Sequence, residues 1–183
     1  MKLSSFVVAP FGSVSRALLD SIRDLRNASA GFRTSWRAND FVSAVATSAE
    51  GFGYLDHVQH ELLRHRDEKS TKAGWKESAF CLALSVKVGE LLQPTSEDDK
   101  AQFASRGPGK GYMPEGATEP LSLNDALYRI KQRATSVVNF AVSSGDVHEL
   151  FIFTPEDMGK SAAISKFDLE QFCGACKAAA KLL

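Results

Sequence analysis

The 183-residue chain lacks several features that would place it at once in a broad class of protein. It has no run of the roughly 18–20 apolar residues that a membrane-spanning helix needs. Its first ten residues hold too short an apolar stretch for a secretory signal, so we interpret residues 1–10 as a strand or extended arm. The three cysteines, an odd number, do not make a disulfide framework. Together these absences predict a cytoplasmic protein.

An excess of one charge is also missing. The chain carries 22 basic and 22 acidic side chains, so its formal net charge is zero. This balance argues against a dedicated nucleic-acid-binding protein, because that class normally has a strong basic excess. A hydrophobic content of 44% with 24% charged residues argues against intrinsic disorder. The length suffices for a sizeable core, and we predict a single domain over residues 1–183.

Apolar spacing predicts three helices in the first half of the chain. The first covers residues 14–27, with the serine before it as its N-cap. The second begins after a cap at residue 39 or Asp40 and ends in the polar stretch 64–72. The third covers residues 75–92, and its apolar positions surround most of the helix, which indicates a central, buried element. The apolar pattern of the second helix follows Phe41, Val45, Ser48, Phe52, Leu55 and Leu62.

Residues 93–120 differ in character because prolines and glycines recur through them. This composition predicts a long loop without regular helix or strand, and such loops tend to be either functional or disordered. Arg106, Lys110 and Tyr112 are its most notable side chains, and we expect them to be exposed. Two cations beside an aromatic ring can contact a phosphate backbone and stack on a base. The alternative is a surface loop whose charges keep it soluble.

The last third of the chain predicts one helix, three strands and a final helix. The first helix begins at Ser122, after which the apolar period changes from about 3.6 to 2. The alternation predicts a strand at residues 138–142, and turn-forming residues separate it from two further strands at 147–153 and 162–167. Asp168 is the natural N-cap of the last helix. The predicted fold is therefore mainly α within the α+β class: a helical bundle with a small antiparallel three-stranded β-meander near the C-terminus.

No catalytic or metal-binding motif is complete. Cys173 and Cys176 resemble a thioredoxin redox pair, but they lie beyond the first turn of their helix, and we interpret them as core residues. His60 and His65 are five residues apart, which rotates the second imidazole away from a zinc-protease arrangement. Residues 159–161 resemble the end of a phosphate-binding loop but lack its first glycine. We predict no catalytic residue, metal or cofactor, although a site assembled from distant residues stays open.

Residues 122–173 resemble a known family. The helix at 123–130, the strand start at 138–140, a hairpin and the segment 166–173 follow one another in the order seen in the closing part of HEPN-like helical domains. These are small bundles common in prokaryotic defence and toxin–antitoxin loci. The resemblance implies a helix that bears the functional motif, followed by a hairpin and a final helix.

Active members of that family are metal-independent ribonucleases whose Arg and His lie four to six residues apart. Here the corresponding helix offers Arg129 and Arg133, with Gln132 where a His would be sought, and Gln is neither a general acid nor a general base. The resemblance therefore implies a non-catalytic binder. It also leaves open an RNA-binding surface formed by Arg129, Lys131 and Arg133.

The sequence thus favours a non-enzyme that acts by binding, with a protein partner or a second copy of the chain as its ligand, and possible links to prokaryotic defence or toxin–antitoxin systems. The alternative is an RNA-binding protein or a metal-independent ribonuclease. A third reading is a small ligand bound between the helices. The residues we expect at a binding site are Arg106, Lys110, Tyr112, Arg129, Lys131 and Arg133.

Overall fold

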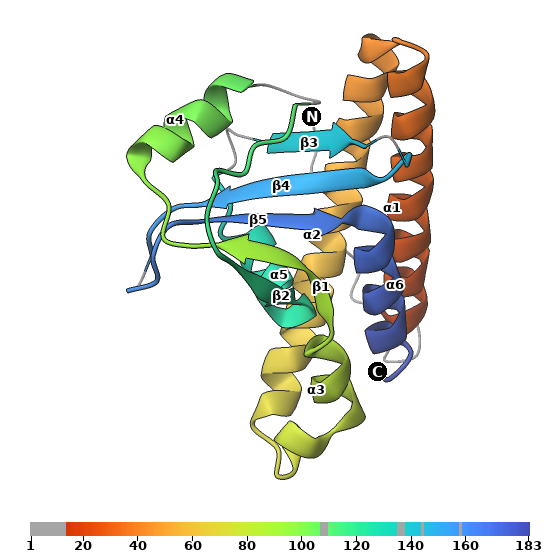
Figure 1. The fold of residues 1–183 in the computed structure, drawn as a ribbon. Coiled ribbons are helices and arrows are strands. Elements are labelled where there is room, and N and C mark those ends of the chain that lie inside the picture. Colours follow the sequence, from red (N-terminus) through yellow and green to blue (C-terminus); the bar gives the residue numbers. More distant parts are fainter. Residues whose placement is uncertain (1–13, 107–109, 135–137, 144, 158) are drawn as a thin grey trace, which may run out of the picture.

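The computed structural model describes residues 14–106, 110–134, 138–143, 145–157 and 159–183. Most of the helices pack on one face of an antiparallel sheet whose strand order is β2-β1-β5-β4-β3, and α4 lies on the other face (Figure 1). The strands are β1 (Lys87–Leu92), β2 (Thr118–Ser122), β3 (Val138–Val142), β4 (His148–Thr154) and β5 (Ala163–Asp168). The helices are α1 (Val14–Arg37), α2 (Phe41–Ser70), the 3-10 helix η1 (Trp75–Glu77), α3 (Ala79–Leu84), α4 (Glu97–Arg106), α5 (Leu123–Lys131) and α6 (Leu169–Ala180).

The α+β class is confirmed, but the predicted count of three strands is wrong. The predicted meander corresponds to β3, β4 and β5, which pair in succession. β1 pairs with the other side of β5, and β2 pairs with β1, so the sheet has five strands. The outer edge of β3 meets Lys110, which bridges to Ala141, while β2 carries Pro120 at the opposite edge.

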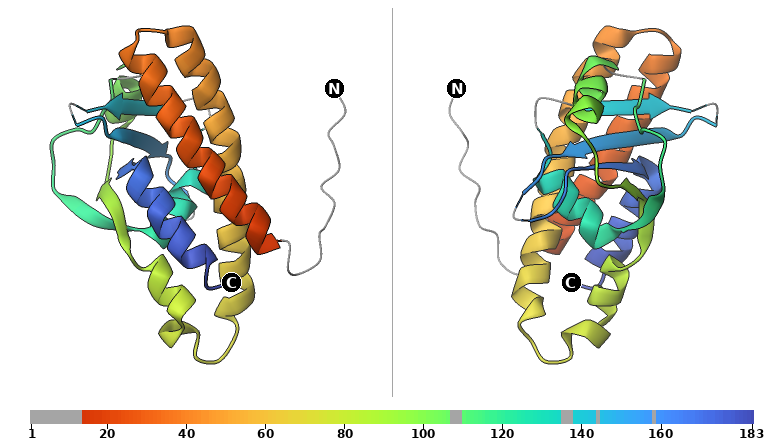
Figure 2. Two further views of the ribbon diagram at one scale, coloured as in Figure 1. Left: turned by 90° about the vertical axis from the view of Figure 1, so that its right-hand side faces the viewer. Right: turned by 60° about the vertical axis from the view of Figure 1, so that its left-hand side comes forward.

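α1 and α2 form a long antiparallel hairpin beside the sheet (Figure 2). The prediction that α1 ends near residue 27 is wrong, because Ser29 and Phe32 continue the buried stripe and the helix runs to Arg37. The predicted cap Ser13 and the predicted arm at residues 1–10 lie outside the described residues. Asp40 is confirmed as the cap of α2, since its carboxylate accepts the Ser43 N–H at 3.1 Å.

The predicted helix over residues 75–92 is wrong over most of its length. The chain forms η1, then the short helix α3, and then the strand β1. Gly89 lets β1 lie close against β5, because a Cβ at this position would lie 2.2 Å from the Lys166 carbonyl oxygen of β5. A strand with buried residues on both faces has apolar positions that resemble those of a buried helix, so the pattern did not distinguish the two.

Residues 93–120 are not the uninterrupted loop that the sequence predicts, because they contain α4 and β2. The prolines and glycines lie outside residues 97–106, which leaves room for a helix. Ser96 and Asp99 cap each other: the Asp99 N–H donates to Ser96 Oγ at 3.1 Å, and the Ser96 N–H donates to Asp99 Oδ2 at 2.7 Å.

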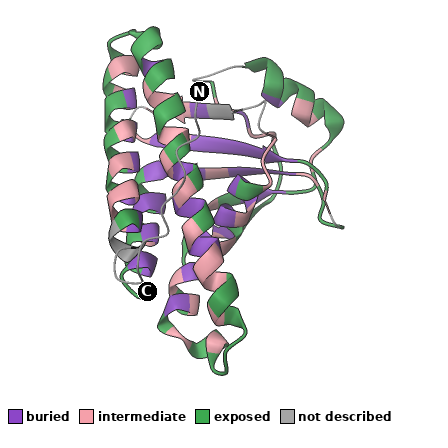
Figure 3. Ribbon diagram, turned by 180° about the vertical axis from the view of Figure 1, so that it is seen from behind, coloured by how far each residue is buried: buried purple, intermediate pink, exposed green. Residues whose placement is uncertain are grey.

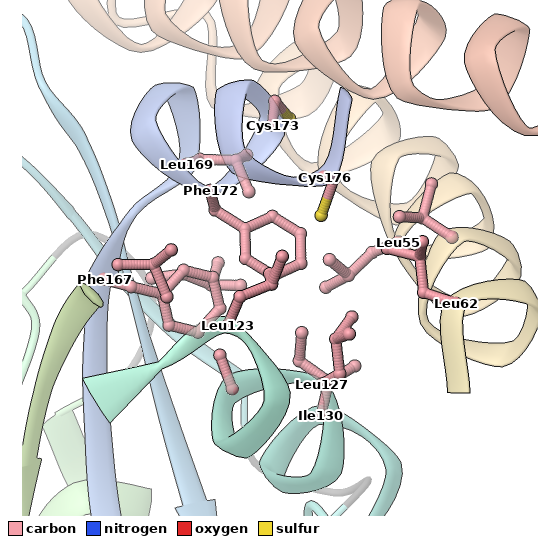
Figure 4. Packing of buried hydrophobic residues seen from close by; sticks show 14 of the residues in the cluster. Leu55, Leu62, Leu123, Leu127, Ile130, Phe167, Leu169, Phe172, Cys173 and Cys176 are labelled. Atoms are coloured by element: carbon pink, nitrogen blue, oxygen red, sulfur yellow. The ribbon is translucent and has the colours of Figure 1, made fainter. Parts of the chain in front are cut away.

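Two apolar clusters hold the layers together. The larger lies between the sheet and helices α1, α2, α5 and α6, and Figure 4 shows Phe172 of α6 pointing into it toward Leu55 and Leu127. The smaller lies on the opposite face of the sheet, where α4 and the segment after it cover the strands. The members of the smaller cluster are Phe103, Tyr112, Phe151, Phe153 and Ile164.

Candidate functional site

The first half of α2 exposes apolar side chains where a surface helix normally exposes charged ones. No charged residue occurs between Asp40 and Glu50. Phe41, Val42 and Val45 are 50%, 84% and 59% exposed. In Figure 3 the upper turns of the hairpin are mostly coloured as exposed. We define the outer face of α2 as Phe41, Val42, Val45, Ala46 and Ala49, all of which are exposed.

This arrangement corrects the predicted apolar stripe of α2. Phe41 and Val45 were expected on the buried side, but among residues 41–54 only the small Ala44 is buried. The hairpin extends past β3, so the first turn of α2 has no sheet to pack on (Figure 1). Phe41 makes an edge-type ring contact with Trp36, with 4.8 Å between the ring centroids. The larger side chains therefore face solvent, and the small one faces α1.

The polar side chain of Thr47 in this segment is turned to the backbone. The Thr47 hydroxyl donates to the Ser43 carbonyl at 2.8 Å, one turn earlier, so its hydrogen-bonding capacity is directed to the backbone. The segment is thus an uncharged helix surface held in place by a capped N-terminus. Exposed apolar surface of this kind marks an interaction site in many soluble proteins.

The structure brings Arg106, Lys110 and Tyr112 close to the smaller cluster but corrects one of them. Tyr112 is buried, and its hydroxyl donates to Asp99 Oδ1 at 3.3 Å. The Arg106 guanidinium lies 4.8 Å from the centroid of the Tyr112 ring. The expectation that Tyr112 is exposed is therefore wrong, and its ring is already engaged by the protein itself. Lys110 and Arg106 are exposed as expected.

The other three predicted residues lie on or just after α5, on the opposite face of the sheet. Arg133 makes a bidentate ion pair with Asp56 of α2, at 2.7 and 3.0 Å, and covers the Phe52 ring. Arg129 is buried, and this burial lowers the pKa of its guanidinium. Lys131 is exposed. The six predicted residues thus form two separate groups.

A buried polar pair, which the sequence did not predict, lies between α1 and β4. The Ser29 hydroxyl and His148 Nδ1 are 2.9 Å apart. The imidazole stacks on the Phe32 ring, with 4.5 Å between centroids and 15° between planes. Burial, together with the charge of Arg33, lowers the pKa of His148 to about 4. No local pattern could indicate this pair, because its members are 119 residues apart.

Cys173 and Cys176 are core residues, as predicted. Cys173 and Cys176 lie on the inner side of α6 among apolar side chains (Figure 4). Burial raises the pKa of Cys173 to about 12 and the pKa of Cys176 well above its ordinary value, so neither is a reactive thiolate at neutral pH. Within the described ranges, no group of three or more His, Cys, Asp or Glu side chains is placed to hold a metal ion.

Comparison with protein-family models, with curated proteins and with solved structures found no match. The resemblance of residues 122–173 to HEPN-like domains therefore stays a prediction. In the part of the chain that the structure describes, no helix combines the length and apolar character needed to cross a membrane.

Proposed function

We propose that this protein acts by binding another protein, with the outer face of α2 as the contact surface. The observation that carries the proposal is the exposure of Phe41, Val42 and Val45 on a helix segment without charge. Charged residues are depleted at the centre of protein interfaces, and aromatic residues are enriched there. The non-catalytic role, the cytoplasmic location and the HEPN-like, prokaryotic-defence context predicted from the sequence belong to the same proposal.

The size of the surface favours a partner that surrounds the helix. The exposed parts of the three large side chains amount to on the order of 300 Å². A stable interface buries about 800 Å² on each partner, so two copies of this face placed together would bury too little. A groove on a partner protein that encloses the first turns of α2 would contact the sides of this helix as well as its outer face. Amphipathic helices are recognised in this way. We therefore assign the face to an apolar groove on a different protein.

Binding to RNA has less support from the geometry. Arg133 is engaged by Asp56, and the Tyr112 ring is buried beneath Arg106. Lys131 and Lys110 are exposed, but they belong to groups on opposite faces of the sheet. A continuous basic surface for a phosphate backbone would need these groups to adjoin.

The test begins with the full chain, tagged and purified from its native host. We expect a near-stoichiometric protein to be retained by the wild type and by His60→Glu, which adds the same charge to the exposed, polar half of the same helix. Val42→Glu should release that protein, because a charge would be buried in an apolar groove. The partner is then purified and its affinity for each variant measured directly.

Two results would overturn the proposal. The first is an affinity for the purified partner that Val42→Glu leaves unchanged while circular dichroism shows the variant to be folded. The second is retention of RNA, with no protein, by the wild type. A second copy as the occupant would be revealed by a dimer mass in light scattering that Val42→Glu abolishes.

A further inference from the structure

The last two turns of α1 are tied to the sheet by one carboxylate. Asp146 lies in the turn between β3 and β4, and Arg33 Nη1 donates to its carbonyl oxygen at 2.9 Å and to its Oδ2 at 3.2 Å. Arg37 Nε, one helical turn later, lies 3.4 Å from Asp146 Oδ1. We define the ion cluster as Arg33, Arg37 and Asp146. It joins two successive turns of α1 to a residue 113 positions after Arg33.

The turn between β3 and β4 holds the carboxylate in place. Asp146 has a φ of 60°, in the left-handed region that Asp and Asn adopt more readily than most residues. Its N–H donates to the Ser143 carbonyl at 2.9 Å, and the Ser143 N–H donates to the Val147 carbonyl at 3.0 Å. An Asn at position 146 would therefore keep the turn and remove only the charge.

The contact between Arg37 and Asp146 is one of charge rather than of hydrogen bonding. Arg37 Nε donates to the Arg33 carbonyl at 3.4 Å, and Asp146 Oδ1, although buried, makes no hydrogen bond to any residue that the structure describes. The side chains of Arg33, Asp146 and Arg37 are 26%, 35% and 59% exposed. Dissolved salt therefore reaches the cluster and weakens it, since the Debye length falls from about 10 Å at 0.1 M to about 3 Å at 1 M.

The ion cluster flanks the helical segment that positions the first half of α2. Trp36, on the same two turns of α1, packs on Phe140 of β3 with 5.3 Å between ring centroids, and Phe41 packs on the other side of the hairpin end against Trp36. Among residues 41–54 only Ala44 is buried, so the position of this half of α2 depends mainly on α1. The outer face of α2 is thus held in place through the end of α1.

We propose that the ion cluster regulates the protein contact at the outer face of α2. While the cluster is closed, the end of the α1–α2 hairpin is fixed against the sheet, and high salt or loss of the Asp146 charge loosens it and weakens binding. A preorganised face binds more tightly because less order has to be gained on association. An apolar contact alone would not be weakened by salt, and some salts would strengthen it. The inference rests on the proposed function.

Hydrogen–deuterium exchange of the full chain, without a partner, tests the cluster directly. Asp146→Asn should speed exchange of the amides of residues 44–50 about fivefold, the effect expected for a partly exposed ion cluster, and should leave the amides of β5 unchanged. Raising NaCl from about 0.1 M to about 1 M should speed the same amides in the wild type but not in Asp146→Asn.

Asp20→Asn is the matched control. It removes the same charge from an exposed ion pair on α1, in which Asp20 lies 2.8 Å from Arg23, and it should leave exchange of residues 44–50 unchanged. The partner that co-purifies with the wild type gives the second readout. Its affinity should fall about fivefold for Asp146→Asn and stay the same for Asp20→Asn.

Unchanged exchange of residues 44–50 in the folded Asp146→Asn variant would overturn the proposal. So would equally faster exchange throughout the chain, because the loss would then be one of general stability, which urea denaturation measures. Faster exchange of residues 44–50 with unchanged affinity for a partner that Val42→Glu releases would overturn it as well. If Val42→Glu leaves the affinity unchanged, the proposed contact itself fails, and the exchange data still decide whether the cluster holds the hairpin end.

Discussion

Acidification should destabilise this protein through His148. Its pKa is lowered to about 4, first by burial and second by the charge of Arg33, whereas the ordinary value is 6.5. Between these values the unfolded chain binds the proton more readily than the folded chain does. The stabilisation that comes from keeping His148 neutral in the folded protein is therefore fully present above pH 6.5. It is lost progressively as the pH falls toward 4.

The magnitude follows from the shift. At about 1.4 kcal/mol for each pH unit, the full effect is about 3 kcal/mol. About 2 kcal/mol of it is lost between pH 7.5 and pH 5, a range in which ordinary carboxylates stay mostly ionised. This is a large share of the stability of a typical domain, which lies between about 5 and 15 kcal/mol.

Urea denaturation at pH 7.5 and pH 5, followed by circular dichroism, measures the loss in three proteins. The wild type and His60→Asn, an exposed site on α2, should lose about 2 kcal/mol more than His148→Asn does. Burial also lowers the pKa of His65, but this contribution is common to all three proteins and cancels in the comparison. Equal losses in all three would refute the reasoning about His148.

Three further predictions concern stability and reactivity. Gly89→Ala should lower the free energy of unfolding by more than about 2 kcal/mol, since the added Cβ would meet the backbone of β5. Gly53→Ala, whose Cβ would have no atom within 4 Å, should be neutral or stabilising by up to about 1 kcal/mol. Urea denaturation checks both, and a tolerated Gly89→Ala would contradict the described packing of β1 against β5. Phe172→Ala should cost about 3–5 kcal/mol in the same assay, because the ring is fully buried; a cost below about 1 kcal/mol would mean that the core is not packed as described. In the native protein at pH 8, Cys173 should resist a thiol reagent while the half-buried Cys81 reacts first. In denaturant the two cysteines should react at equal rates. Fast labelling of Cys173 in the native protein, measured by mass spectrometry, would contradict its burial.

The elements that could be predicted from sequence are those with local determinants. The alternation that marks β3 is contained in that strand, and turns separate β3, β4 and β5 from one another. Asp40, Ser122 and Asp168 cap their helices through hydrogen bonds to residues two or three positions later. Such contacts need no knowledge of the remaining chain, so residue type and spacing suffice.

The rest depends on contacts between distant segments. β1 forms because β5 and β2 lie on either side of it, and only Gly89 hints at so close an approach. The exposure of the outer face of α2 could not be predicted from the sequence for a similar reason. Phe41 and Val45 are apolar residue types that usually lie in a core. Their exposure depends on how far the α1–α2 hairpin extends past the sheet. The pairing of Arg133 with Asp56 is equally non-local, and it gives a structural role to a residue expected to bind RNA.

The central position of β5 has a consequence for synthesis of the chain. β5 follows the other four strands in sequence, yet it joins the β1–β2 pair to the β3–β4 pair. Until residues 163–168 have left the ribosome, β1 and β4 each present an unpaired inner edge, and such edges recruit strands from other chains. A stalled nascent chain, or a proteolytic fragment that ends before residue 163, is therefore expected to aggregate, and chaperones would be needed to protect these edges during translation.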